Sequence, residues 1–162
     1  MKVVTIWKRL ALLASILSGL YLAGCTSGAE RIDKLLETLP MPSNVDLLYE
    51  QDGVRQGSQD ACFFPYTKQL YGTNQSFEQI VTFYTSTLDQ AGWHKRVDDL
   101  VPPGSLSWEK GRDFWLSLSS DPRLDFPEEV VSDAHSHYET VYFLVVTYID
   151  RIAREKCLGR KY

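Results

Sequence analysis

The chain has 162 residues, with 17 Lys plus Arg against 21 Asp plus Glu and a formal net charge of −4. The length corresponds to one domain, and no internal repeat or low-complexity segment is visible. The acidic balance argues against nucleic-acid binding, which depends on clusters of Lys and Arg.

The first 24 residues have the three parts of an export signal. Lys2, Lys8 and Arg9 make the start basic, and an apolar run covers residues 10–22. Such a run has about the 7–15 residues of a secretion signal and is shorter than the ~20 residues that span a bilayer. The small residues Ala23 and Gly24 then precede Cys25.

The motif Leu22-Ala23-Gly24-Cys25 resembles the lipobox of bacterial lipoproteins. The resemblance implies cleavage between Gly24 and Cys25, a diacylglyceryl thioether on the Cys25 sulfur, and often an N-acyl chain such as palmitate on the new amine. Two or more acyl chains anchor a protein stably, whereas one chain holds it marginally. The alternatives are an ordinary secretion signal and an uncleaved anchor.

The residue after the cysteine bears on location. By the same resemblance, Thr26 in place of Asp implies the outer membrane of a bacterium with two membranes, on its periplasmic or surface side. In a bacterium with one membrane, the chain would lie on the outer face of the plasma membrane.

We therefore divide the chain into a cleaved signal (1–24), a lipidated tether with a short helix (25–42) and a single α+β domain (43–162). The signal holds three basic residues and no acidic ones, which leaves 17 − 3 = 14 basic against 21 acidic residues after cleavage, a net charge of −7. We expect the lipid, rather than overall charge, to hold this domain at a membrane.

The first predicted elements are one helix and two strands. Apolar residues at helical spacing predict an amphipathic helix over 30–39, which either folds onto the domain or contacts a membrane or a partner. Strands are expected at 45–50 and 61–71, joined by the polar segment 51–59. Pro65 predicts an edge position or a bulge in the second strand.

The central helix has the clearest local signals. Ser76 and Gln79 form the capping-box pattern at its start, and Gly92 is typical of its end. A broad apolar stripe predicts that residues 77–91 pack into the core. The segment 76–93 is also similar to small bacterial lipoproteins of unassigned function, a resemblance that brings no catalytic residues with it.

The rest of the chain is predicted to be mainly β. Strands are expected at 93–97, 106–110, 114–119 and 138–149, an acidic loop at 121–136, and a short helix from Asp150 to Gly159. The run 138–149 is apolar on both faces, which predicts a central strand. The fold class is therefore α+β: an antiparallel sheet of about five to six strands in the order β-β-α-β-β-β-β, with helix 77–91 on one face.

Two cysteines remain after cleavage, Cys62 and Cys157. An oxidising compartment permits a disulfide between them, and the alternative is two buried thiols. A redox-active pair of the C-x-x-C type is absent from the sequence.

Only one cluster has metal-ligand character: Asp133, His135 and His137. On a strand, the two imidazoles of His-x-His share one face, as in many zinc sites, and Asp133 could serve as a third ligand. The alternative is a solvated polar loop. No nucleophile elbow, Walker loop or dinucleotide motif is present in the sequence.

Trp115 is a candidate binding residue. The alternation of its strand places Trp115, Ser117 and Ser119 opposite Phe114, Leu116 and Leu118. An exposed indole would suit stacking or an interface anchor, and packing in a second layer is the alternative.

These observations support two hypotheses. The first is a lipid-anchored, non-enzymatic domain that binds a protein or an envelope component on the outer side of a bacterial membrane and needs no cofactor beyond its covalent lipid. The second is a metal-binding lipoprotein or metal-dependent hydrolase that uses Asp133, His135 and His137 with a divalent metal.

Overall fold

The computed structural model describes residues 27–56, 62–97, 104–123 and 125–157. The signal segment and Cys25 lie outside these ranges. The helices are α2 (Gly28–Leu36), α3 (Phe77–Gln90), α4 (Glu128–His137) and α5 (Arg151–Cys157). The strands are β1 (Val45–Gln56), β2 (Phe63–Thr73), β3 (Trp93–Lys95), β4 (Ser105–Lys110), β5 (Phe114–Ser119) and β6 (Thr140–Tyr148).

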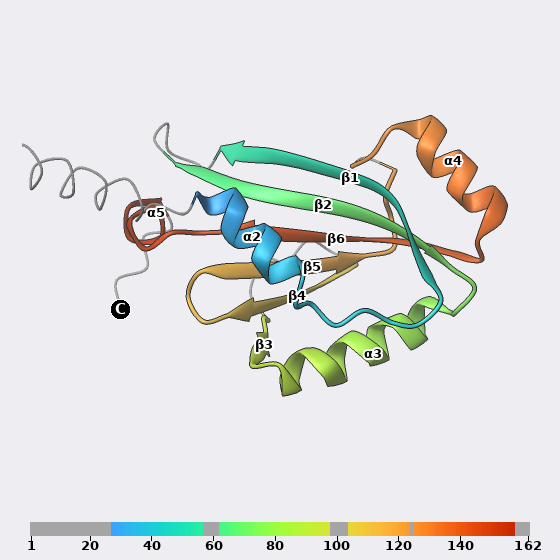
Figure 1. The fold of residues 1–162 in the computed structure, drawn as a ribbon, viewed down its shortest axis with the longest axis horizontal. Helices are drawn as coiled ribbons and strands as arrows, with labels where there is room; N and C mark the ends of the chain where they lie inside the picture. The colour runs from blue at the N-terminus through green and yellow to red at the C-terminus, as the bar shows by residue number, and fades with distance from the viewer. Residues whose placement is uncertain (1–26, 57–61, 98–103, 124, 158–162) are drawn as a thin grey trace, which may run out of the picture.

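The strands form one open antiparallel sheet in the order β1-β2-β6-β5-β4-β3 (Figure 1). β6 pairs with β2 on one side and with β5 on the other, so the prediction of a central strand from its apolar, β-branched and aromatic run is confirmed. The α+β class and the antiparallel sheet are confirmed as well.

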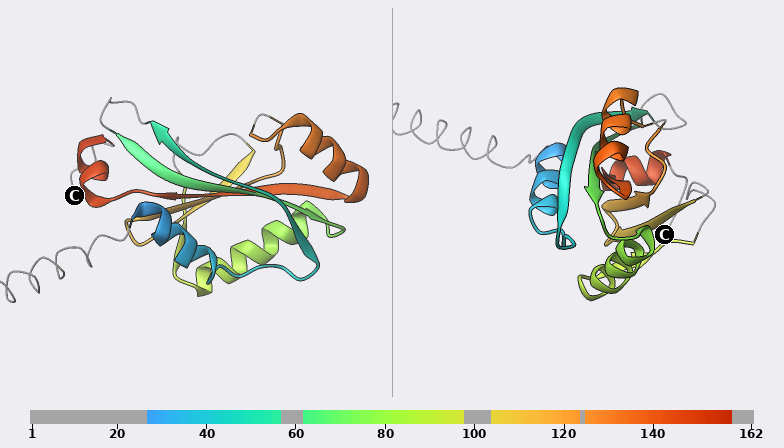
Figure 2. Two further views of the ribbon diagram at one scale, coloured as in Figure 1. Left: turned by 45° about the horizontal axis from the view of Figure 1, so that its top comes forward. Right: turned by 90° about the vertical axis from the view of Figure 1, so that its right-hand side faces the viewer.

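Helices cover both faces of this sheet (Figure 2). α2 and α3 pack on one face, where Leu35, Ile80 and Leu88 join alternate residues of β6 in the larger core cluster. α4 packs on the other face, where Val131 and Ala134 contact Val141, Phe143 and Val145. Alternate β6 side chains thus point into different cores, as the two-residue period of a strand requires.

α3 follows its sequence signals closely. The Ser76 hydroxyl accepts from the Gln79 backbone N–H, and the Gln79 side chain accepts from the Ser76 backbone N–H. Gly92, with φ of +78°, lies in the left-handed region just after the helix. The predicted capping box and helix end are therefore confirmed.

The prediction of an acidic loop over 121–136 is wrong, because Glu128–His137 form α4 between β5 and β6. Pro127 precedes the helix, and Glu128 and Glu129 occupy its first turn, where carboxylates interact favourably with the helix dipole. The predicted order with a single main helix is corrected to β-β-α-β-β-β-α-β between the flanking helices α2 and α5.

β1 is also longer than predicted and continues through Gln51–Gln56. Most of these side chains are exposed on both faces, so the segment lacks the alternation that identifies a strand. Pro65 of β2 pairs with Val54 of β1, whereas the ladder with β6 begins only at Tyr66. Pro65 therefore sits at a local edge, in agreement with its missing N–H.

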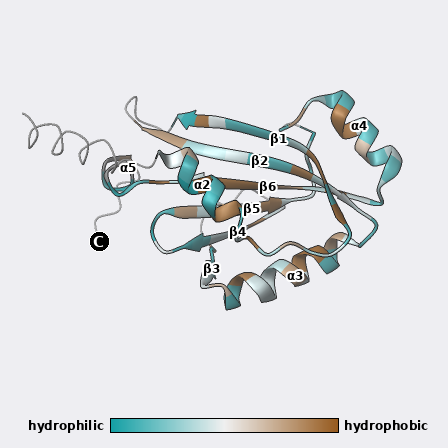
Figure 3. Ribbon diagram, in the orientation of Figure 1, coloured by the Kyte–Doolittle hydropathy of each residue, from teal (hydrophilic) through white to brown (hydrophobic). Residues whose placement is uncertain are grey.

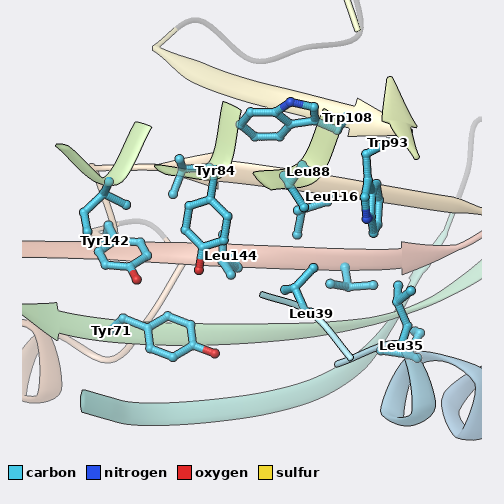
Figure 4. Packing of buried hydrophobic residues seen from close by; sticks show 14 residues of the cluster. Leu35, Leu39, Tyr71, Tyr84, Leu88, Trp93, Trp108, Leu116, Tyr142 and Leu144 are labelled. Atoms are coloured by element: carbon cyan, nitrogen blue, oxygen red, sulfur yellow. The ribbon is translucent and has the colours of Figure 1, made fainter. Parts of the chain in front are cut away.

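Three buried tyrosines occupy the larger core cluster (Figure 4). Tyr71 stacks on Tyr142 with ring centroids 5.4 Å apart, and Tyr84 meets Tyr142 edge-on at 6.4 Å. The Tyr71 hydroxyl donates to Oε1 of Gln69 at 2.7 Å, and the Tyr84 hydroxyl lies 3.4 Å from Sδ of Met41. Burial raises the pKa of Tyr142 to about 12 and raises the pKa values of Tyr71 and Tyr84 further.

The two ends of the sheet differ, and we name each by a helix. At the α2 end, α2 begins against β2 and β6: a Cβ on Gly28 would lie 2.6 Å from Cγ of Pro65 and 2.9 Å from Cδ1 of Tyr148. At the α4 end, β1 and β6 begin and β2 finishes, around Asp46, Gly72 and Tyr138. The eight steps of β6 from Thr140 to Tyr148 separate the ends by about 26 Å.

Candidate functional site

Cys62 and Cys157 form a disulfide with their Cα atoms 5.8 Å apart, as predicted. It joins the start of β2 to the end of α5 across 95 residues of sequence. Both cysteines are buried, with Phe64 and Ile149, in a small cluster against which Trp115 packs. The bridge is therefore a structural element at the α2 end.

Trp115 faces away from Leu116 and Leu118, as its alternation predicts, but its indole is only partly accessible. The Arg96 guanidinium lies 3.8 Å from the ring centroid and that of Arg154 lies 5.9 Å away. The indole Nε1 is buried and has no hydrogen-bond partner among the described residues. The ring therefore fills a second layer and is no open stacking platform.

Asp133, His135 and His137 lie on α4 rather than on a strand, which corrects the basis of the predicted metal site. His135 and His137 are two positions apart on a helix, so their imidazoles point about 200° apart around the helix axis and do not share a face. Nδ1 of His137 lies 3.8 Å from Oδ1 of Asp133 and 2.9 Å from the Asp133 carbonyl oxygen. Within the described ranges, no three Asp, Glu, His or Cys side chains gather as a metal site would require.

A polar hollow formed by described residues lies at the α4 end, and we call it the distal groove. It has a volume of about 520 Å³, within the usual range of ligand sites. Its walls come from three segments: the start of β1, the end of β2 and the turn before β6. They are formed by Asn44, Asp46, Thr73, Asn74, Gln75 and Tyr138.

Local hydrogen bonds fix the floor of the distal groove. The Thr73 hydroxyl donates to the Asn44 carbonyl oxygen at 2.8 Å, and the Gln75 amide donates to the Ser43 carbonyl oxygen at 2.5 Å. Asn44 has a φ of 57°, and Asn tolerates this left-handed conformation better than most residues. The turn before β1 is thus fastened to the end of β2, which holds Asn44 and Asn74 at the rim.

Tyr138 forms the third wall. Its ring packs on Gly72, where any Cβ would overlap it, and its hydroxyl donates to Oδ2 of Asp46 at 2.8 Å. This hydrogen bond, together with the charges of Asp46 and Asp133, raises the pKa of the Tyr138 hydroxyl. The hydroxyl stays protonated near neutral pH, and Asp46 is exposed.

The lining of the distal groove presents amides, hydroxyls and one carboxylate, and no Lys or Arg. Glu139 follows Tyr138, and Asp133 acts on Tyr138 from the last turns of α4. The site therefore suits a neutral or cationic ligand rich in hydrogen-bonding groups and disfavours an anion. The sequence did not identify these residues as a site. The one signal that could have indicated the groove is that polar residues flank the facing ends of two predicted paired strands.

Within the described ranges, no helix combines the length and apolar character needed to cross a bilayer. Comparison with known proteins gives no match, whether to a protein-family model, to a curated protein or to a solved structure.

Proposed function

We propose that this chain is a lipid-anchored domain on the outer side of a bacterial membrane, which binds a protein or another envelope component through the distal groove. The observation that carries the anchor is the motif Leu22-Ala23-Gly24-Cys25, which lies two residues before Ser27, the N-cap of α2. A tether this short leaves the domain little freedom to move away from its acylated cysteine.

The positions of the two features support this division of roles. The first turn of α2 and the distal groove lie near opposite ends of β6, and the length of β6 separates them by about 26 Å (Figure 1). An anchor at Cys25 would therefore leave the distal groove facing away from the bilayer. Such an orientation suits recognition of a partner in the envelope space.

Charge supports the same orientation. Exposed carboxylates gather at the α4 end, on Glu128, Glu129, Asp133 and Glu139. The nearest basic residues are paired: Arg123 with Asp121, and Lys68, midway along β2, with Asp125. An anionic membrane surface repels an acidic end, and the distal groove shares this acidic field.

Substitution of Cys25 with Ser should abolish fatty-acid labelling and leave the precursor uncleaved, because the hydroxyl cannot replace the thiol as acceptor of the diacylglyceryl group. Metabolic labelling and mass analysis of protein made in a bacterial host measure both effects. Thr26→Ser is the matched control and should be labelled and processed normally. Normal labelling of Cys25→Ser would refute the anchor.

A photo-crosslinking residue placed at Asn74, on the rim of the distal groove, should capture a discrete partner in intact cells. The same residue placed at the exposed Thr85 of α3 is the control and should not capture it. Asp46→Lys reverses the charge of the groove and should remove the Asn74 product. Identical products from both positions, or an Asn74 product that survives Asp46→Lys, would contradict the groove as the binding site.

A further inference from the structure

An apolar patch lies at the α2 end, on the face of the sheet that carries α2. Val54 of β1 is 61% exposed and Phe63 of β2 is 56% exposed, which is unusual for such side chains. Val54 pairs with Pro65, and Phe63 pairs with Gln56, so Val54 and Phe63 project from the same face. Figure 3 shows apolar colour at the start of β2 and in a band just before the hydrophilic tip of β1.

The patch continues into a hollow under the start of α2. This hollow has a volume of about 270 Å³ and is lined by residues of α2, β1 and β2: Ala29, Ile32, Asp52, Gly53, Val54, Pro65, Tyr66 and Thr67. Val54 belongs to both features, so the exposed side chains and the hollow form one continuous surface. This surface is mainly apolar, and its one carboxylate, on Asp52, accepts a hydrogen bond from the Thr67 hydroxyl at 2.6 Å. We call this surface the proximal patch, with Val54, Phe63 and Pro65 as its defining residues.

The proximal patch lies close to Cys25 in space. Three residue steps separate Cys25 from Gly28, and an extended chain spans at most about 3.6 Å per step, or about 11 Å in all. Gly28 in turn packs directly against Pro65. Acyl chains on Cys25 would bring the bilayer surface within reach of Val54 and Phe63.

One cationic side chain, that of Arg31, borders the proximal patch. Arg31 of α2 lies over the Tyr148 ring at 5.2 Å. Arg55, one residue after Val54, projects from the opposite face of β1 and lies over the Tyr66 ring at 6.0 Å. Both residues are exposed. An arginine beside exposed apolar side chains is typical of surfaces that lie on anionic lipid. Acidic side chains are also present at this end, where Glu30 of α2 pairs with Lys34.

We propose that the proximal patch docks onto the bilayer, with Phe63 and Val54 entering the interfacial region and Arg31 at the level of anionic headgroups. This inference rests on the proposed lipid anchor and adds a second, non-covalent contact that fixes the orientation of the domain. The patch faces the membrane, and the distal groove faces away from it.

Tryptophan reporters test the contact. Phe63→Trp and, separately, Val54→Trp are introduced into the full chain, and the mature lipidated protein is reconstituted into vesicles of phosphatidylethanolamine and phosphatidylglycerol. A second set of vesicles carries lipid brominated in the upper part of the acyl chains, which quenches an indole that enters the interface. Leu47→Trp is the matched control, because Leu47 is also on β1 and 52% exposed but lies toward the α4 end.

The native tryptophans contribute equally to all variants and are removed by subtracting the wild-type signal. Interfacial side chains reach about 5–10 Å into the headgroup boundary, so both proximal reporters should lose at least about twice as much emission as the Leu47→Trp control. Equal quenching at Phe63 and Leu47 in protein that floats with the vesicles would overturn docking and leave the anchor intact. It is also the result expected if a second copy or a partner protein covers the patch. Protein that does not float with the vesicles would overturn the anchor and the docking together.

Discussion

Removal of the disulfide should destabilise the domain more than a typical point substitution does. In the chain-entropy model, a bridge that closes 95 residues stabilises the fold by about 4–5 kcal/mol, because it restricts the unfolded chain. A small domain has only about 5–15 kcal/mol of net stability, so this is a large share of the total. We expect Cys62→Ala/Cys157→Ala to lower the free energy of unfolding by about 3–5 kcal/mol.

The effect should also have a local component. α5 has seven residues, too few for a helix that is stable alone, and the bridge fastens its last residue to β2. Without the bridge, α5 should detach from Phe64 and Ile149 and expose Trp115, which shifts its fluorescence to longer wavelength. Alanine is chosen because both sites are buried and a serine hydroxyl there would need a partner.

Urea denaturation of the variant and of the oxidised wild type measures the change, and wild-type protein under reducing conditions is the control for the substitutions themselves. The oxidised protein should be two hydrogens lighter by mass than its dithiol form. Free thiols in natively exported protein, or an unchanged urea midpoint, would contradict a stabilising role.

Most strands and α3 could be predicted from the sequence because their signals are local. The Ser76–Gln79 capping box defines the start of α3, and the alternation of Phe114, Leu116 and Leu118 defines β5. α4 could not be predicted from the sequence, because two prolines and several acidic residues surround its short apolar stripe of Val131 and Ala134 and are typical of a loop. That stripe is recognisable only once β6 and β2 supply the surface it covers.

The candidate site was harder to predict than the fold. Asn44, Asn74 and Tyr138 are ordinary turn or strand-end residues in sequence, and they form a groove only because β1, β2 and β6 meet at the α4 end. His135 and His137 show the converse. A pattern that would place two ligands together on a strand separates them on a helix, so the element must be known before the motif can be interpreted.

The second large effect is expected at alkaline pH and comes from the buried tyrosines. An unfolded tyrosine ionises near pH 10, whereas burial raises the pKa of Tyr142 to about 12 and raises those of Tyr71 and Tyr84 as well. Above pH ~10 the unfolded chain therefore binds fewer protons than the folded one, and stability falls as the pH rises. Each such tyrosine lowers the free energy of unfolding by about 1.4 kcal/mol per pH unit until its folded pKa is reached. By pH ~12 the three together lower it by an amount comparable to the net stability of a small domain.

Tyr142→Phe tests this argument. The phenyl ring keeps the contacts with Tyr71 and Tyr84 but removes one hydroxyl that must otherwise remain protonated in the fold. At pH ~7 all of these tyrosines are neutral in both states, so the difference in unfolding free energy between variant and wild type provides the baseline. Above pH ~10 the difference should move in favour of the variant by about 1.4 kcal/mol per unit, up to pH ~12.

Tyrosinate absorbance recorded during the same titration should show the buried hydroxyls ionising together with unfolding. Ionisation of these tyrosines in the folded domain, or a difference that does not change with pH, would contradict the burial of Tyr142 as the cause.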